Sequence, residues 1–132
     1  MQLNLSTDIA LRTLIYLGKS RGSVTIAEVS EAFDIAKTHL MKVVMALVAA
    51  NLVISERGRN GGIRLALDAQ DISVGAVVRM MEKNLALVVC MKDGATNDVC
   101  PLMPKCKLRK LFFNAQAAFL ATLDGSTLAD IM

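Results

Sequence analysis

The segment Thr25–Leu67, which reads TIAEVSEAFDIAKTHLMKVVMALVAANLVISERGRNGGIRLAL, decides the fold. Its first residues form a capping-box pattern, because the Thr25 hydroxyl can accept a hydrogen bond from the backbone amide of Glu28 while the Glu28 carboxylate reaches back. A short helix is therefore predicted from Thr25 to about Ala32. The following Phe33–Ile35 is predicted to be a tight turn, since its central aspartate tolerates the left-handed backbone conformation better than most residues.

A longer helix is predicted from Ala36 to Ala50, followed by two short strands, Val53–Glu56 and Ile63–Leu67. The apolar face of this helix is expected to consist of Met41, Val44, Met45 and Val48. Between the strands lies RGRNGG, residues 57–62, whose Asn-Gly pair is a strong hairpin signal because both residues accept positive φ. A short helix, a turn, a longer helix and a β-hairpin in this order predict a winged helix-turn-helix.

Further helices are predicted on either side of this module. The first is expected to be capped by Ser6 or Thr7, and another is expected to begin at Asp71 or Ser73 and to end near residue 83. The fold class is therefore mainly α with a small β-hairpin.

A long C-terminal helix is predicted from Lys105 to Leu123, after a loop over Leu85–Pro104. Its apolar stripe consists of Leu108, Leu111, Phe112, Ala115, Ala118, Phe119 and Leu123. Hydrophobic residues make up 54% of the chain, a surplus that favours a buried subunit interface, and the long helix is the predicted dimerisation element. The chain is thus divided into residues 1–83, a DNA-binding domain, residues 84–106, a cysteine-bearing loop, and residues 107–132, the dimerisation helix and C-terminal segment.

The positive charge of the predicted module is uneven. Net charge is only +3, but between residues 37 and 64 five Lys and Arg side chains stand against Glu56 alone, which favours a polyanionic partner. In a helix-turn-helix the second helix enters the major groove of double-stranded DNA with its N-terminal residues. The predicted DNA contacts are Lys37, Thr38, His39 and Lys42, together with Arg57, Arg59 and Asn60 at the hairpin tip. The alternative is a solvated basic hairpin, with His39 as an exposed residue, a titrating switch or a metal ligand.

Cys90, Cys100 and Cys106 are the only cysteines of the chain. An odd number does not form a disulfide framework, and their spacing lacks the paired knuckles of zinc fingers. Soft thiolates in a loop suit an iron–sulfur cluster, and the Lys and Arg residues around Cys106 offset the negative charge of such a cluster. A zinc site, a disulfide switch and three ordinary cysteines are the alternatives. Chemistry alone leaves the fourth ligand open between His39 and a carboxylate, and Asp8 fits equally well as a helix-dipole or capping residue.

The composition also limits the class of protein. The longest apolar runs, Val43–Ala50 and Leu85–Met91, are too short to span a bilayer, and the N-terminal sequence lacks a signal-peptide pattern. No membrane association and a cytoplasmic location are therefore expected. An enzyme is not expected, because the sequence shows no nucleophile–base constellation and no phosphate-binding loop, and it has a single histidine.

Several stretches together resemble the NsrR/IscR family of iron–sulfur winged-helix transcription regulators. They are Met1–Leu3, Thr7-Asp8, Leu11-Arg12, Leu14–Tyr16, His39–Val43, Arg57–Leu65, the cysteine triad and Leu123–Asp130. The sequence is most similar to the nitric-oxide-sensing repressors of this family. The resemblance implies a homodimer joined by the long helix, with a 4Fe–4S cluster held by the three cysteines and by Asp8 of the partner subunit. The 2Fe–2S members carry a histidine in the cysteine region, where this chain has none.

Other functions are weighed against a nitric-oxide-responsive repressor. One is a regulator of the same fold that senses iron, cluster supply or redox state, and another is a zinc- or cluster-bearing protein-interaction module that does not bind DNA. The sequence also departs from the family at two places. Nine residues, Met91–Val99, separate the first two cysteines where the family usually has five, and Ala36 stands where a helix-capping serine is common.

Overall fold

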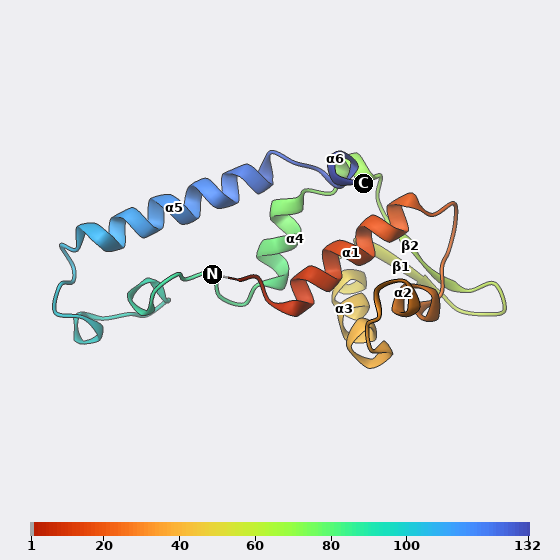
Figure 1. Ribbon diagram of the computed structural model, residues 1–132, viewed down its shortest axis with the longest axis horizontal. Coiled ribbons are helices and arrows are strands. Elements are labelled where there is room, and N and C mark those ends of the chain that lie inside the picture. The colour runs from red at the N-terminus through yellow and green to blue at the C-terminus, as the bar shows by residue number, and fades with distance from the viewer. Residues whose placement is uncertain (1) are drawn as a thin grey trace.

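The computed structural model describes residues 2–132. The helices are α1 (Leu5–Lys19), α2 (Ile26–Phe33), α3 (Lys37–Ala49), α4 (Val74–Met81), α5 (Lys107–Asp124) and α6 (Leu128–Ile131), with strands β1 (Val53–Glu56) and β2 (Gly62–Leu65) and short 3₁₀ turns η1 (Ala69–Asp71), η2 (Val89–Met91) and η3 (Asn97–Val99). One end of the molecule holds α1 to α3 and the hairpin, while α5 extends to the other end (Figure 1). The predicted fold class and winged-helix order are confirmed.

Local hydrogen bonds explain how α2 and the turn after it form. The backbone amide of Thr25 donates to the Glu28 carboxylate at 2.6 Å, and the amide of Glu28 donates to the Thr25 hydroxyl at 3.2 Å, which completes the predicted capping box. Asp34 then adopts the left-handed conformation, with φ 51° and ψ 48°. α3 begins at Lys37 without a side-chain cap, since Ala36 offers no acceptor.

The buried face of α3 differs from the predicted one. Leu40, Val43, Val44 and Leu47 are buried, whereas Met41 and Met45 are 52% and 69% exposed. The four residues predicted to form one apolar face are therefore divided, because Val44 is buried while both methionines are exposed. The core follows the i, i+3, i+4, i+7 series that starts at Leu40, because this series lies toward α1 and the sheet. Both methionines therefore lie on the outer surface of the helix.

The hairpin pairs Val53 with Leu65 and Glu56 with Gly62 in antiparallel register. Residues 57–61 form its tip, where Gly58 has φ 115° and its carbonyl accepts a hydrogen bond from the amide of Gly61 at 3.0 Å. The expected Asn-Gly turn with two positive φ angles was therefore wrong, because positive φ occurs at Gly58 instead. An added Cβ on Gly62 would lie 2.6 Å from the Val24 carbonyl oxygen, so glycine allows Val24 to pair with Ile63 beside the hairpin.

A single core joins α1 to the winged helix and to the end of the chain. The cap of α1 is Asn4, whose side-chain oxygen accepts from the amide of Thr7 at 3.0 Å, and not Ser6 or Thr7 as predicted. Core side chains include Ile9, Leu14, Leu40, Leu47, Ile72 and Leu128. The amide of Leu128 donates to the Ile72 carbonyl at 2.8 Å, so α6 returns to the body formed by the first 83 residues.

α5 stands apart from this core, because none of its residues is buried. It contacts α4, with Asp124 at its C-terminal end paired with Arg79, and Figure 1 shows it reaching the end of the molecule opposite the hairpin. In residues 2–132, no helix combines the length and the apolar character that crossing a membrane requires.

Candidate nucleic-acid interface and cysteine segment

The predicted DNA contacts lie at the winged-helix end of the molecule. Lys37, Thr38 and Lys42 are exposed on the first turns of α3. Arg57, Arg59 and Asn60 are exposed at the tip of the hairpin, which projects from this end in Figure 1. Their exposure leaves all six side chains available to a partner.

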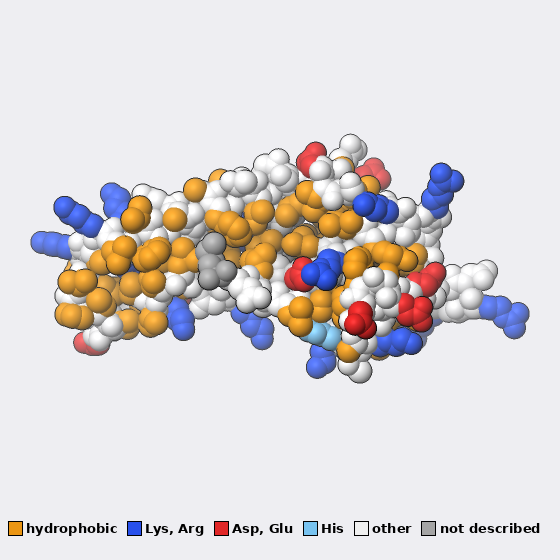
Figure 2. Space-filling model, in the orientation of Figure 1, with side chains coloured by type: hydrophobic (Ala, Val, Ile, Leu, Met, Phe, Trp, Pro, Cys, Tyr) orange, Lys and Arg blue, Asp and Glu red, His pale blue; other side chains and the backbone are white. Residues whose placement is uncertain are grey.

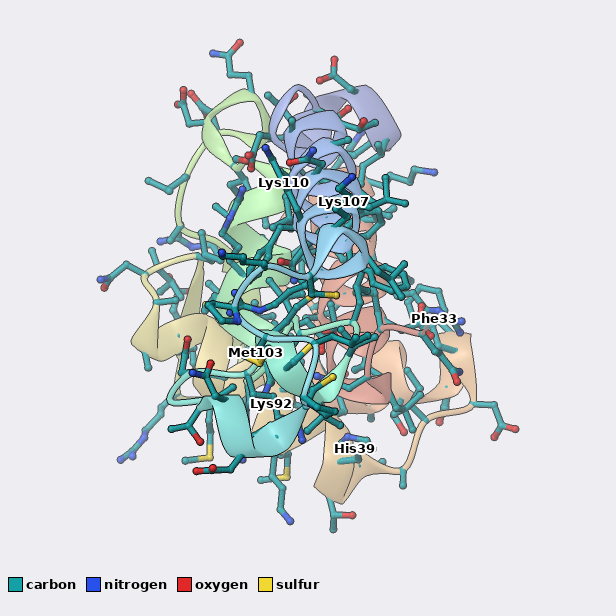
Figure 3. All side chains as sticks on the ribbon, turned by 90° about the vertical axis from the view of Figure 1, so that its left-hand side faces the viewer. Phe33, His39, Lys92, Met103, Lys107 and Lys110 are labelled. Carbon is teal, nitrogen blue, oxygen red and sulfur yellow. The ribbon has the colours of Figure 1, made fainter. Side chains whose placement is uncertain are left out.

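His39 is held differently from the other α3 residues. It is half-buried, and its Nε2 lies 3.1 Å from the Ser6 hydroxyl, so the ring joins α3 to the first turn of α1. Figure 3 shows the residue at the edge of the molecule formed by these helices. A groove of about 1090 Å³ runs beside it, between the start of α1, the side of α3 that carries Thr38, Lys42 and Ala46, and the end of α4 with the residues that follow it. The sequence offered no signal for this contact, since Ser6 and His39 are 33 residues apart.

Glu82 connects the end of α4 to the start of α1. Its carboxylate accepts hydrogen bonds from the buried Thr7 hydroxyl at 2.6 Å and from the Asn4 amide at 2.8 Å. Partial burial raises the pKa of Glu82, but the hydrogen bonds from Thr7 and Asn4 together outweigh it, so this pKa lies below its ordinary value. The cysteine segment begins directly after Glu82, so this residue anchors that segment to α1.

The three cysteines are half-buried and unpaired on the segment between α4 and α5. Cys90 lies in η2, Cys100 directly follows η3, and Cys106 is the N-cap of α5. The sulfur of Cys106 accepts from the Arg109 amide at 3.4 Å, so one backbone amide of the first turn of the helix points at this sulfur. Figure 3 views the molecule from this end, with Lys92, Lys107 and Lys110 projecting around the segment.

Arg109 ties two of the cysteine positions together. Its Nε donates to the Cys90 carbonyl at 2.8 Å, and its guanidinium lies 4.9 Å from the centre of the Phe113 ring. The backbone at Cys90 is therefore fastened to the first turn of α5, where Cys106 lies. This role of Arg109 was not foreseen, because 19 residues separate it from Cys90.

The donor set fits an iron–sulfur cluster in chemistry, since Cys thiolates are the usual cluster ligands and three of the usual four are free in this segment. The three sulfur atoms, however, are not gathered into a metal site. Within residues 2–132, no three His, Cys, Asp or Glu side chains gather closely enough to hold a metal ion. Ligation by Cys90, Cys100 and Cys106 therefore stays a prediction.

Asp8 lies on α1 and pairs with Arg12 of the same helix. One carboxylate oxygen accepts from Arg12 Nε at 3.0 Å, and the other lies 2.7 Å from a terminal guanidinium nitrogen. The Asp8 side chain is 44% exposed, and Asn4 rather than Asp8 caps the helix. The structure does not group Asp8 with two cysteines of its own chain.

The apolar stripe of α5 divides into two parts. Phe112, Phe119 and Leu123 are half-buried, while Leu108 and Leu111 are 56% and 61% exposed. Phe112, Ala115 and Phe119 line a groove of about 540 Å³ together with Leu3, Leu85 and Leu87. Figure 2 shows hydrophobic side chains covering much of this end of the molecule. The surface is far more apolar than a solvated helix requires.

Comparison with known proteins identifies the family. Residues 3–132 match the model of the Rrf2 family, described as "Iron-dependent Transcriptional regulator". The chain belongs to the Rrf2 family. It is 43% identical over 134 aligned positions to the HTH-type transcriptional regulator NsrR of Geobacillus kaustophilus, covering 100% of this chain and 90% of that protein. Identity to NsrR of Bacillus subtilis is 40%, with the same coverage.

Solved structures of Rrf2 regulators share the fold. The structure of CymR, the global cysteine regulator of B. subtilis, superposes with a TM-score of 0.78 at 22% identity and covers 99% of this chain and 95% of that one. T. potens IscR gives a TM-score of 0.78 at 22% identity, with 99% and 85% covered. The predicted resemblance is confirmed, and this Rrf2 chain is a transcriptional regulator of a winged-helix, DNA-binding family. Membership in that family suggests an iron–sulfur cofactor.

Proposed function

We propose that this Rrf2 regulator is a homodimeric repressor that binds operator DNA, carries an iron–sulfur cluster and responds to nitric oxide. The observation that carries the proposal is the set of three free cysteines, placed next to α5 and joined through Glu82 to the winged helix. Full-length similarity to NsrR regulators supports the proposal of a nitric oxide response.

The DNA-binding part of the proposal rests on α3 and the hairpin tip. Lys37, Thr38 and Lys42 would face base edges and phosphates in the major groove. Arg57, Arg59 and Asn60 would contact the adjoining backbone or the minor groove, where negative potential favours arginine. His39 would position the start of α3 through Ser6 rather than read bases with the same ring nitrogen.

For the cofactor, we infer that Cys90, Cys100 and Cys106 hold the cluster with Asp8 of the partner subunit as the fourth ligand. Three thiolates and one carboxylate match a 4Fe–4S cluster better than the histidine-bearing 2Fe–2S type. When bound, the cluster supplies iron that reacts with a small diatomic gas. Arg109 would hold the Cys90 backbone against the first turn of α5, and the neighbouring lysines would offset negative charge.

A hydrogen-bonded route connects the cysteine segment with the recognition helix. Glu82 precedes the segment and binds Asn4 and Thr7 at the start of α1, and Ser6 of the same turn contacts His39 on α3. A rearrangement of the segment would therefore shift the first turn of α1, and with it the start of α3. This is the element through which loss of the cluster would weaken DNA binding.

The test is a DNA-binding titration of anaerobically reconstituted protein, before and after stoichiometric nitric oxide. We expect binding to a duplex selected from a random pool, and loss of at least tenfold in affinity after nitric oxide. Arg59→Ala should weaken DNA binding and reduce the slope of log affinity against log salt concentration by about one, as expected for one lost phosphate contact. Arg59→Lys should keep both the affinity and this slope. Affinity that changes with iron chelation or oxidants but not with nitric oxide would instead support a regulator of iron or redox state. Failure to select any duplex would contradict DNA binding.

A further inference from the structure

The exposed side of α3 carries two large apolar side chains, Met41 and Met45, beside the exposed Lys37, Thr38 and Lys42. Met45 is 69% exposed, the highest value among the large hydrophobic residues that the structure describes, and Met41 is 52% exposed. Neither was expected there, and neither is needed for the core, which uses Leu40, Val43, Val44 and Leu47 of the same helix.

Helical spacing places these methionines among the proposed DNA contacts. Residues four apart lie one above the other along a helix, so Lys37, Met41 and Met45 form one row. Thr38 and Lys42 form the row next to it, and both are exposed. The apolar row is thus bordered by two lysines, whose charge selects a polyanion rather than an apolar protein surface as the occupant.

The major groove of DNA offers one apolar group to such a row, which is the C5-methyl of thymine. We propose that Met41 and Met45 are specificity-determining residues that read thymine methyl groups in the operator. This inference rests on the proposed DNA binding by α3. The two residues are separated by a rise of about 6 Å along the helix, close to the spacing of two base-pair steps. The flexible thioether side chain can follow a methyl group without a strict rotamer.

The experiment removes the methyl groups from the DNA and the methionines from the protein separately. A duplex is selected from a random pool with the reconstituted protein, and each thymine in its half-sites is replaced in turn by deoxyuridine, which differs only by the methyl. We expect a loss of about fourfold in affinity at a contacted thymine, which corresponds to burial of one methyl at about 0.8 kcal/mol.

Protein variants assign the methyl groups to residues. Each of Met41→Ala and Met45→Ala should lose the preference for thymine over deoxyuridine at one base position of the half-site. Met41→Leu should keep this preference. Met132→Ala is the matched control, because Met132 is 41% exposed but lies against Gly18, near the end of α1 away from α3. Both α3 methionines are exposed, so their replacement should leave the unfolding transition unchanged.

The outcomes separate this inference from the proposed function. If no duplex is enriched, the proposed DNA binding fails and this inference fails with it. If a duplex binds tightly but contains no thymine in its half-sites, or if deoxyuridine weakens the parent and both alanine variants equally, only the role of the methionines is overturned. A change of oligomeric state in Met45→Ala would overturn it too, because the face would then contact a second copy of the chain.

Discussion

At the scale of single residues, the protonation of Glu82 is coupled to the fold through its hydrogen bonds to the start of α1. Burial raises its pKa and the hydrogen bonds from Thr7 and Asn4 lower it, with a net pKa below the ordinary value of 4.5. A carboxyl group whose pKa is lowered by folding stabilises the protein at pH values above its pKa in the unfolded chain. This stabilisation is lost as the pH falls through its pKa in the folded protein. Glu82→Gln should therefore lower the free energy of unfolding by about 1 kcal/mol at pH 7, and this difference should shrink as the pH falls through the folded-state pKa of Glu82.

Urea unfolding of the parent and of Glu82→Gln between pH 3 and pH 7 measures this difference. Glu31→Gln, on an exposed position of α2, is the control and should change little at any pH. A constant difference between the parent and Glu82→Gln over the whole range would show that the Thr7 hydrogen bond does not depend on the carboxylate charge.

At the scale of elements, the start of α3 lacks an N-cap side chain that accepts a hydrogen bond from the first turn. Ala36, the residue before this helix, has φ −56° and ψ 127° and makes no side-chain cap. Ala36→Ser should supply an acceptor to the first turn and raise the free energy of unfolding by about 1 kcal/mol. Ala46→Ser, in the middle of the same helix, should lower it by a few tenths, roughly the difference in helix propensity.

Both variants are compared with the parent by urea denaturation. If both serine variants change the free energy of unfolding equally, the added hydroxyl at position 36 does not cap the backbone amides at the start of α3. A stabilised α3 also tests its role, because Ala36→Ser should retain DNA binding if the helix binds in the conformation described.

Elements governed by neighbouring residues were predictable, and those governed by distant contacts were not. The capping box of Thr25 and Glu28 needs only local sequence, and so does the left-handed turn at Asp34. The positive φ of the hairpin tip falls at Gly58 rather than at the Asn-Gly pair, and Gly61 lies against the backbone of the same turn. Only Gly62 is placed by a residue far away in sequence, because it lies against the backbone of Val24, which pairs with Ile63.

The candidate site follows the same division. Exposure of Lys37, Thr38 and the wing residues followed from their position in the motif, but the orientation of Met41 and Met45 depended on which side of α3 meets α1. Bonds such as His39 with Ser6, or Arg109 with Cys90, join residues far apart in sequence and leave no local pattern. The sequence shows three cysteines in one segment, but the tertiary contacts that would bring their sulfur atoms together cannot be predicted from it.

At the scale of the whole molecule, the exposed apolar face of α5 is the surface that we propose for dimerisation. Leu108 and Leu111 are more than half exposed on a helix that has no buried residue, which fits the dimer that the family implies. Leu111→Asp should give a folded monomer, because the charge is solvated in the single chain but would be buried without a partner in a dimer. Ala117→Asp adds the same charge on another face of α5 and should remain dimeric.

Sedimentation velocity at micromolar concentration distinguishes the two variants. A parent that sediments as a monomer, or a Leu111→Asp variant that remains a dimer, would show that the subunits associate through a different surface. Circular dichroism of the same samples checks that the helices are retained.

The central claim for the molecule is that the three cysteines of one segment hold an iron–sulfur cluster beside a DNA-binding domain. The most direct measurement is the iron, sulfide and zinc content of anaerobically purified protein, taken with its visible absorption spectrum. The account predicts a brown protein with about four irons and four sulfides per subunit, and loss of both in Cys90→Ala, Cys100→Ala and Cys106→Ala. Stoichiometric zinc without sulfide after anaerobic reconstitution, or a cluster retained by all three variants, would contradict it.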